Sequence, residues 1–341
     1  MPTSRQILRR QLSCAVCLVS LVLAGTTQAE ETTDAANKAE LLDKIFDAWT
    51  KRQQNTKTLQ ATWQETIFQA ADPAGDEPEQ TKSQKLAFTL GPNGETSLIS
   101  TPLPAAADNA NGQVTEVSSF NGQRHFHFTS FVENKKDEGW PIGSVWDTKA
   151  SDDAHAAQIR PWLLHLRPLG EPAPHLTRDN VKVVATDVDF QGRRCIVLER
   201  RDETPRIGVF YVDPQRDYAI IGYHSQVGDR LTLTMTVTPT FDRQLGWRPA
   251  QWDCEFANGR FKVSGVLLQC KVNVDLPPET FTPDFPRGTI VFDKDKGLRS
   301  LILGEGQRRI ITPEESAAGF VYKDLFTTKS GDLAPAKKRG Q

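Results

Sequence analysis

The chain has 341 residues, of which 38% are hydrophobic and 25% are charged, and its formal net charge is -2. This composition is typical of a globular protein with one large domain or two small ones, and it excludes a multi-pass membrane protein. The slightly acidic balance argues against nucleic acid as a partner, because neutralising phosphates requires clustered lysine and arginine.

The N-terminus has the features of a secretory signal. Arg5, Arg9 and Arg10 precede an apolar run over residues 15–25, and small residues follow up to Ala29. This is the order of n-region, h-region and cleavage site. The apolar run has only about half of the roughly 20 residues that a membrane-spanning helix needs. We therefore expect residues 1–29 to be a cleaved signal peptide, and the protein to be periplasmic or secreted.

A helix and two strands are expected next. Residues 37–54 carry apolar side chains at three- and four-residue spacing, which predicts one amphipathic helix. From Thr58 the spacing changes to two, which predicts a strand that contains Trp63. A second alternating set, over residues 86–90, contains Phe88 and ends at the turn sequence Gly91-Pro92-Asn93-Gly94.

Asn121-Gly122 predicts a tight hairpin turn between two further strands. With these two residues at the centre of the turn, Val117 lies opposite Phe126 and Thr115 lies opposite Phe128. His125 and His127 then lie on the other face of the strand.

A short helix is expected between residues 152 and 169, where Trp162, Leu163 and Leu166 have helical spacing. Strands then resume as an antiparallel meander, and Asn258-Gly259 predicts a hairpin that sets Cys254 opposite Val263. The lack of alternating strands and helices argues against a parallel doubly wound sheet. The expected strands of this region are 181–189, 195–200, 207–212, 219–226, 231–237, 251–257 and 261–274.

Three cysteines follow the signal peptide: Cys195, Cys254 and Cys270. An odd number cannot be fully paired within one molecule. The hairpin register places Cys270 on the opposite face from Cys254 unless a bulge intervenes, so we expect free, buried thiols.

Several segments resemble, in the same order, one known family. They are the helix leading into Leu59-Gln-Ala-Thr-Trp-Gln-Glu-Thr, the aromatic strand after Ser119-Phe-Asn-Gly, Tyr211-Val-Asp-Pro, and the closing stretch from Glu279 to Asp293 with its Phe-Thr-Pro and Pro-x-Gly sequences. Together they are similar to the periplasmic carriers of outer-membrane lipoproteins (LolA/LolB-like). The resemblance covers residues 38 to 293.

The resemblance implies a mainly β fold with helices, in which a curved antiparallel sheet forms an unclosed half-barrel covered by the N-terminal helix and the mid-chain helical insertion. This domain would span residues 30–297, and residues 298–341 would be a partly disordered C-terminal extension. The implied function is non-enzymatic binding of an acyl chain or lipidated protein in a hydrophobic concavity, with membrane-bound donor and acceptor proteins as further partners. The candidate residues of concavity and lid are Trp63, Phe88, Phe126, Phe128, Trp162, Leu163 and Leu166.

The sequence departs from the family at one point. In the carriers, an arginine follows the strand that matches residues 86–90 and helps to hold the lid shut, whereas this chain has Gly91-Pro92-Asn93 there. A relative that binds another lipid, or that senses lipidated proteins, would keep the fold without this arginine. The alternative is a β-rich envelope sensor or protein-interaction domain whose pocket is filled by its own side chains, because aromatic residues on alternating strands are usually plain core.

Enzymatic and metal-binding motifs give little support to other functions. His125-x-His127 would place two imidazoles on one strand face, but the sequence pattern supplies no third ligand. A Gly-x-Ser-x-Gly nucleophile motif is also lacking. We therefore expect no metal, no cofactor and no enzymatic activity.

Overall fold

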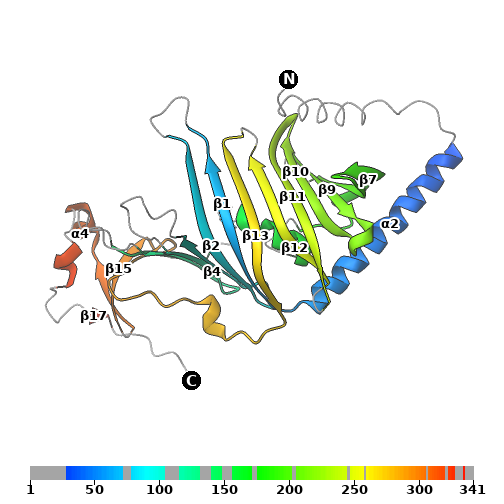
Figure 1. Ribbon diagram of the computed structural model, residues 1–341. Coiled ribbons are helices and arrows are strands. Elements are labelled where there is room, and N and C mark those ends of the chain that lie inside the picture. The colour runs from blue at the N-terminus through cyan, green and yellow to red at the C-terminus, as the bar shows by residue number, and fades with distance from the viewer. Residues whose placement is uncertain are drawn as a thin grey trace. The chain divides into compact units, whose positions relative to one another are not determined.

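A computed structural model of the chain describes residues 28–71, 78–103, 115–130, 140–147, 156–170, 175–201, 205–243, 246–256, 259–304, 306–318, 322–326 and 333–334 (Figure 1). The expected signal peptide lies outside the described residues, except for its last two positions. The chain forms two compact units, 1–44 and 45–341. Helix α2 (Gln28–Asn55) begins in the first unit and ends in the second. In the first unit, Glu40 and Lys44 form an ion pair on successive turns of this helix.

The second unit is built on a single sheet of 17 strands. The pairings place the strands in the order β7-β8-β9-β10-β11-β12-β13-β1-β2-β3-β4-β5-β6-β14-β15-β16-β17. All neighbours are antiparallel except β6 and β14. The strands are β1 (Leu59–Gln69), β2 (Gln80–Leu90), β3 (Thr96–Pro102), β4 (Thr115–Phe120), β5 (His125–Ser130), β6 (Ile142–Trp146), β7 (Val181–Phe190), β8 (Arg193–Arg201), β9 (Arg206–Asp213), β10 (Ala219–Val227), β11 (Arg230–Asp242), β12 (Gly246–Phe256), β13 (Phe261–Val272), β14 (Ile290–Asp293), β15 (Leu298–Gly304), β16 (Gln307–Ile311) and β17 (Leu333–Ala334).

Short helices join or cover these strands. They are α3 (Ala156–Leu166), α4 (Pro313–Ala318) and the 3-10 turns η2 (Pro214–Arg216), η3 (Pro278–Phe281) and η4 (Tyr322–Phe326). The sheet is not closed into a barrel, so the predicted mainly β fold with an unclosed antiparallel sheet, an N-terminal helix and a mid-chain helix is confirmed. The chain contains more strands than the sequence pattern predicted. After residue 297, β15 and β16 continue the sheet.

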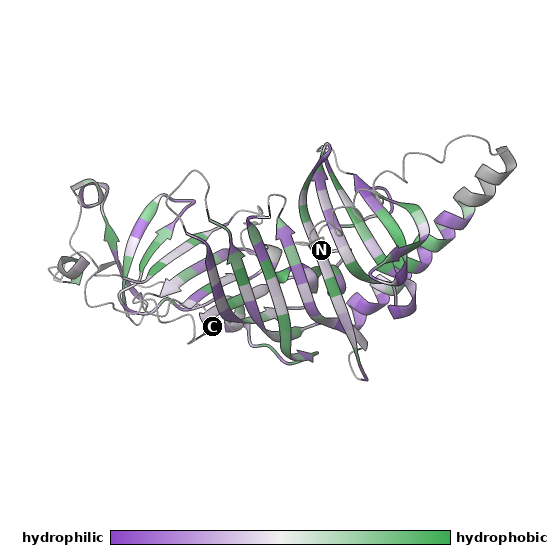
Figure 2. Ribbon diagram, turned by 45° about the horizontal axis from the view of Figure 1, so that its top comes forward, coloured by the Kyte–Doolittle hydropathy of each residue, from purple (hydrophilic) through white to green (hydrophobic). Residues whose placement is uncertain are grey.

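Hydrophobic and hydrophilic residues alternate along many of the strands, as Figure 2 shows by colour. The pairing decides which alternating sets share a face. Trp63 pairs with Leu86, Leu86 with Ser100, Ser100 with Glu116 and Glu116 with Thr129, without any register shift from β1 to β5. Because directly paired residues point to the same side and neighbours along a strand to opposite sides, Trp63 and Phe128 lie on opposite faces.

We name the two faces by what covers them. The helix face carries Trp63 and is covered by α3 through Trp162. The loop face carries Phe126 and Phe128 and is crossed by residues 282–285, with Phe285 packed against Phe128 at 6.2 Å between ring centroids.

The predicted register of the hairpin between β4 and β5 is wrong by two residues. Val117 pairs with Phe128 and Ser119 pairs with Phe126. The reason is the role of Asn121, whose backbone N–H donates to the carbonyl of Arg124 at 3.1 Å and whose side chain accepts from the N–H groups of Gln123 and Arg124. Gly122, with φ of 87°, is therefore the first central residue of the turn. A shift of two residues leaves each side chain on its predicted face of the sheet. His125 and His127 therefore lie on the other face from Phe126 and Phe128, as predicted.

The hairpin between β12 and β13 has the predicted register, with Cys254 opposite Val263. Further along β13 a bulge interrupts the pairing, so that Trp63 faces Leu267 and Thr62 faces Gln269. The extra residue, Leu268, returns Cys270 to the face that carries Cys254. The expected opposite placement is therefore wrong, whereas the expectation of free thiols is confirmed for Cys195, Cys254 and Cys270.

The free thiols lead to a labelling prediction. Burial raises the pKa of Cys195 to about 11 and that of Cys254 to about 12, and it also raises the pKa of Cys270, which is less buried. At about pH 8 a thiol reagent should modify Cys270 first and the other two only as the protein unfolds, because the thiolate is the reactive form. Mass spectrometry of the labelled peptides measures the order. If fewer than three thiols react in denaturant without a reductant, a disulfide is present and the assignment is wrong.

Candidate functional site

Four aromatic side chains form a cluster between α3 and the helix face. Trp63 of β1, Phe88 of β2, Trp162 of α3 and Trp252 of β12 are each at most 1% exposed. The ring centroid of Trp63 lies 5.5 Å from that of Trp252 and 6.3 Å from those of Phe88 and Trp162. We call these four residues the aromatic cluster. Aromatic contacts of this kind contribute beyond the apolar area that they bury.

Glycine at position 265 makes room for this cluster. Gly265 pairs with Trp252 across β12 and β13 and with Glu65 across β1. A side-chain carbon at this position would lie 2.1 Å from the indole of Trp252, which is far inside contact distance. The glycine therefore lets the indole lie flat over its own sheet.

Helix α3 is enclosed on all sides over its second half. Every residue from 161 to 168 is buried, including His165 and Arg167. The last turn of α2 holds it from the other side, since Arg52 donates to the carbonyl of His165 at 3.1 Å and Arg167 donates to the carbonyl of Gln53 at 3.0 Å. Burial, together with the charge of Arg52, holds the pKa of His165 well below its usual value.

A buried carboxyl group lies beside the aromatic cluster. The Oε1 atom of Glu65 accepts from Gln84 Nε2 at 2.7 Å and from Gln158 Nε2 of α3 at 3.0 Å. Ser100 donates to the side-chain carbonyl of Gln84 at 2.7 Å. Burial raises the pKa of Glu65, against the opposing effect of these hydrogen bonds. Glu65 thus connects the sheet to α3 through a carboxyl group that is buried from solvent.

Several polar atoms around α3 are buried without a hydrogen-bond partner in the described part of the chain. They are the indole N–H groups of Trp162 and Trp252 and the side-chain oxygen Oε1 of Gln53. A buried polar group that is left unsatisfied costs about 1–3 kcal/mol. The contact between α3 and the sheet is therefore less stable than its apolar area alone would suggest.

The structure brings together only some of the predicted site residues. Trp63, Phe88 and Trp162 meet in the aromatic cluster, and Leu163 and Leu166 are buried in the same helix. Phe126 packs with Val145, Val291 and Ile302 on the loop face, and Phe128 lies on that face too. The one concavity that we expected to contain all seven residues is thus divided between two faces of the sheet.

Two central residues were missing from the prediction. Trp252 could have been found, because it alternates with Cys254 and Phe256 on one apolar strand face. Glu65 carried a signal as well, because a period of two places it between Trp63 and Ile67 on the apolar face of the strand. The sequence does not show its hydrogen-bond partners from β2 and α3.

The histidine pair of β5 lies on the helix face, away from the aromatic cluster in strand order. His125 stacks between Phe120 and Trp146, with centroid distances of 4.5 and 5.2 Å. Among the described residues, no group of three or more His, Cys, Asp or Glu side chains is placed to hold a metal ion. Within the same residues, none of the helices combines the length and the apolar character needed to cross a membrane.

Glu65 gives a prediction about pH. Its pKa is raised in the folded state, so the free energy of unfolding should fall as the pH rises from the ordinary glutamate range through the raised value. The change Glu65→Gln removes the ionisation and should abolish this part of the decline. The free energy of unfolding of the variant, relative to that of the unchanged protein, should therefore be higher at neutral pH than at acidic pH.

Denaturant unfolding of the protein and the variant across about pH 4–8 measures the difference. Glu279→Gln, at an exposed position, is the control and should follow the unchanged protein. If the Glu65→Gln and Glu279→Gln curves are parallel at every pH, the burial of an ionisable Glu65 is not what shapes the pH dependence.

Comparison with known proteins gives distant structural similarity. No protein-family model matches the chain, and no curated protein sequence matches it. Similar solved structures include a DUF1329 family protein from Desulfovibrio piger, with 12% identity and a TM-score of 0.44 over 70% of this chain and 95% of that one.

Two further structures are a putative outer membrane lipoprotein-sorting protein domain from Vibrio parahaemolyticus, with 12% identity and a TM-score of 0.41, and a LolA superfamily protein from Nitrosomonas europaea, with 17% identity and a TM-score of 0.42. They cover 69% and 71% of this chain, and 94% and 99% of their own. Members of the family that the sequence resembles are thus among the structures similar to this chain, at low identity.

Proposed function

We propose that this protein is an exported, non-enzymatic lipid-binding protein, which takes an acyl chain of a lipid or lipidated protein on the helix face where α3 now lies. The observation that carries the proposal is the aromatic cluster between α3 and the sheet. The sequence pattern of residues 1–29, in which basic, apolar and small residues follow one another as in a secretory signal, supports a periplasmic or secreted location.

The aromatic cluster suits an exchange of α3 for an acyl chain. Displacing α3 would uncover Trp63, Phe88 and Trp252, and an acyl chain can restore the burial of this apolar surface. The indole N–H of Trp252 lacks a partner beneath α3, and an acyl chain linked through an ester or amide brings carbonyl acceptors with it. The proposed ligand thus replaces the contacts of α3 and satisfies a donor that α3 leaves unpaired.

Delivery or collection of such a ligand implies partners in the membrane. An acyl chain or a lipidated protein is anchored in a bilayer before it is bound. We therefore propose membrane-bound donor and acceptor proteins as the further partners of the helix face.

A second function is favoured by the burial of α3 itself. Residues 161–168 already fill the helix face, as in a sensor or protein-interaction domain whose pocket is filled by its own side chains. In that case α3 is permanent core, and the surface of the protein carries the function.

A lipid-binding experiment separates the two. The protein lacking residues 1–29 is purified, extracted with organic solvent and analysed for copurified lipid by mass spectrometry, and a fluorescent fatty acid is then titrated. The substitution Trp252→Ala should weaken probe binding by about tenfold, as loss of one aromatic contact implies. Phe241→Ala, which removes an aromatic ring that is 59% exposed on β11, should leave it unchanged.

A second variant tests whether α3 has to move. Gln158→Ala removes a hydrogen bond between α3 and Glu65, so displacing α3 becomes easier and probe affinity should rise by about threefold to tenfold. Permanent packing of α3 predicts a less stable protein with no gain in affinity. The lipid proposal fails if no lipid copurifies and the probe does not bind the unchanged protein or the Gln158→Ala variant.

A further inference from the structure

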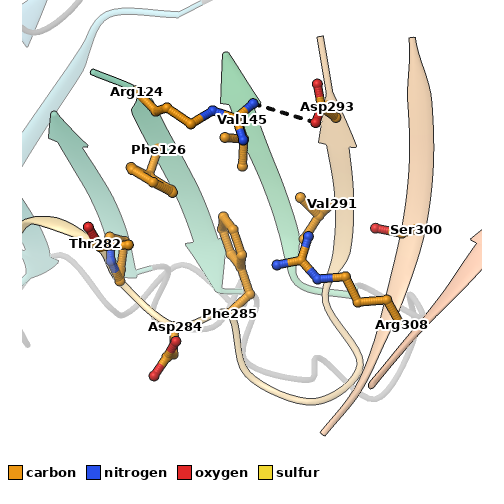
Figure 3. A pocket seen from close by; sticks show the side chains of 11 residues that line it. Arg124, Phe126, Val145, Thr282, Asp284, Phe285, Val291, Asp293, Ser300 and Arg308 are labelled. Carbon is orange, nitrogen blue, oxygen red and sulfur yellow. Dashed lines mark hydrogen bonds and ion pairs between the residues drawn. The ribbon is translucent and has the colours of Figure 1, made fainter. Parts of the chain in front are cut away.

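A cavity of about 130 Å³ lies on the loop face, on the side of the sheet opposite the aromatic cluster. Its apolar wall consists of Phe126, Val145 and Val291 from the sheet and Phe285 from the crossing segment (Figure 3). The site is separate from the proposed lipid site, because the register from β1 to β5 places the two on different faces.

The sheet is shaped to hold Phe285 at this cavity. A side-chain carbon on Gly143 of β6 would lie 2.6 Å from the ring of Phe285. Glycine at this position therefore allows the ring to rest on the strand. Asn121 donates to Thr282 Oγ1 at 3.2 Å and ties the crossing segment to the turn between β4 and β5.

Two arginines line the cavity, and they differ in whether a carboxylate pairs with them. The charge of Arg124 is compensated by carboxylates, since it pairs with Asp147 and lies 3.5 Å from Asp293 and 3.6 Å from Asp295. Asp293 also lines the cavity, and it pairs with Lys296 at 3.2 Å. Asp284 lines the rim, but Figure 3 shows its carboxylate turned away from the cavity.

Arg308 of β16 differs from Arg124. Its side chain reaches between Phe285 and Val291 (Figure 3), and none of the described residues forms an ion pair or a side-chain hydrogen bond with it. Ser300, which is 7% exposed, lines the same wall with its hydroxyl directed inward. The cavity thus offers one uncompensated guanidinium and one hydroxyl beside an apolar wall.

We infer that this cavity binds a small carboxylate that carries one compact apolar group. A guanidinium binds a carboxylate through two parallel hydrogen bonds, and the hydroxyl of Ser300 donates a third. An apolar cavity of about 150 Å³ holds a benzene ring, so the apolar part of the ligand is of that size. A free aromatic or branched acid and the C-terminal carboxylate of a peptide with an apolar last residue share this chemistry.

The test compares acids with their neutral counterparts by calorimetric titration of the protein lacking residues 1–29. The probes are benzoate and benzamide, and a short peptide ending in leucine as the free acid and as the amide. Benzoate should bind saturably and at least about tenfold more tightly than benzamide, because the amide cannot accept two charge-assisted hydrogen bonds. If the natural ligand is the C-terminus of a peptide, the peptide acid should bind in preference to its amide. If the natural ligand is a free acid, benzoate should bind and the peptide acid should not.

Variants locate the binding on this cavity. Arg308→Gln should weaken benzoate binding by at least about tenfold, whereas Arg230→Gln, at an exposed position of β11, should not change it. Trp252→Ala should leave benzoate binding intact, and benzoate should not displace the fluorescent fatty acid, so this inference and the lipid proposal can fail independently. Equal binding of benzoate and benzamide, absence of saturable binding to either acid, or unchanged affinity of Arg308→Gln would overturn the inference.

Discussion

Uninterrupted strand pairing from β1 to β5 is the constraint on which the remaining structure depends. Five strands pair without a bulge, so every side chain on them is assigned to one of two faces by position alone. Trp63 and Phe88 thereby face α3, whereas Phe126 and Phe128 face the segment that carries Phe285. Two chemically different environments result: an aromatic cluster beneath a helix, and a small cavity lined by the guanidinium of Arg308, which pairs with none of the described residues.

The helix face shows two opposing contributions to stability. Burial of aromatic side chains favours the seating of α3, with edge-to-face and tilted contacts at 5.5 to 6.3 Å. Unpartnered indole N–H groups and a buried carboxyl group oppose it. The packing of α3 against the sheet is therefore stabilised less than the burial of its aromatic contacts alone would suggest.

Local signals in the sequence predicted the elements well and the site only in part. Strand and helix periodicity predicted α3 and the antiparallel meander that starts at residue 181, and the hairpin at Cys254 and Val263 has the predicted pairs. The register of the hairpin at Asn121 differs from the predicted one by two residues, because the asparagine precedes the two central residues of the turn and its side chain accepts hydrogen bonds from the backbone that follows, instead of being a central residue itself. The division of the aromatic candidates between two faces could not be predicted for a different reason: β3 was not predicted, so the faces of β2 and β4 could not be related. The alternation of Trp63, Glu65 and Ile67 places Glu65 on the apolar face, but its hydrogen-bond partners lie 19 and 93 residues away, and no local pattern reveals them.

Strand β1 also has a consequence for how the chain folds. It pairs on one side with β2, which follows directly, and on the other with β13, so that Leu59 lies opposite Val272. Contacts between residues so distant in sequence close late, because the entropy of the intervening loop is lost first. During synthesis one edge of β1 therefore remains unpaired until β13 has emerged. An unpaired strand edge is a template for aggregation, so in this topology the protection of β1 waits for a strand made much later in the chain.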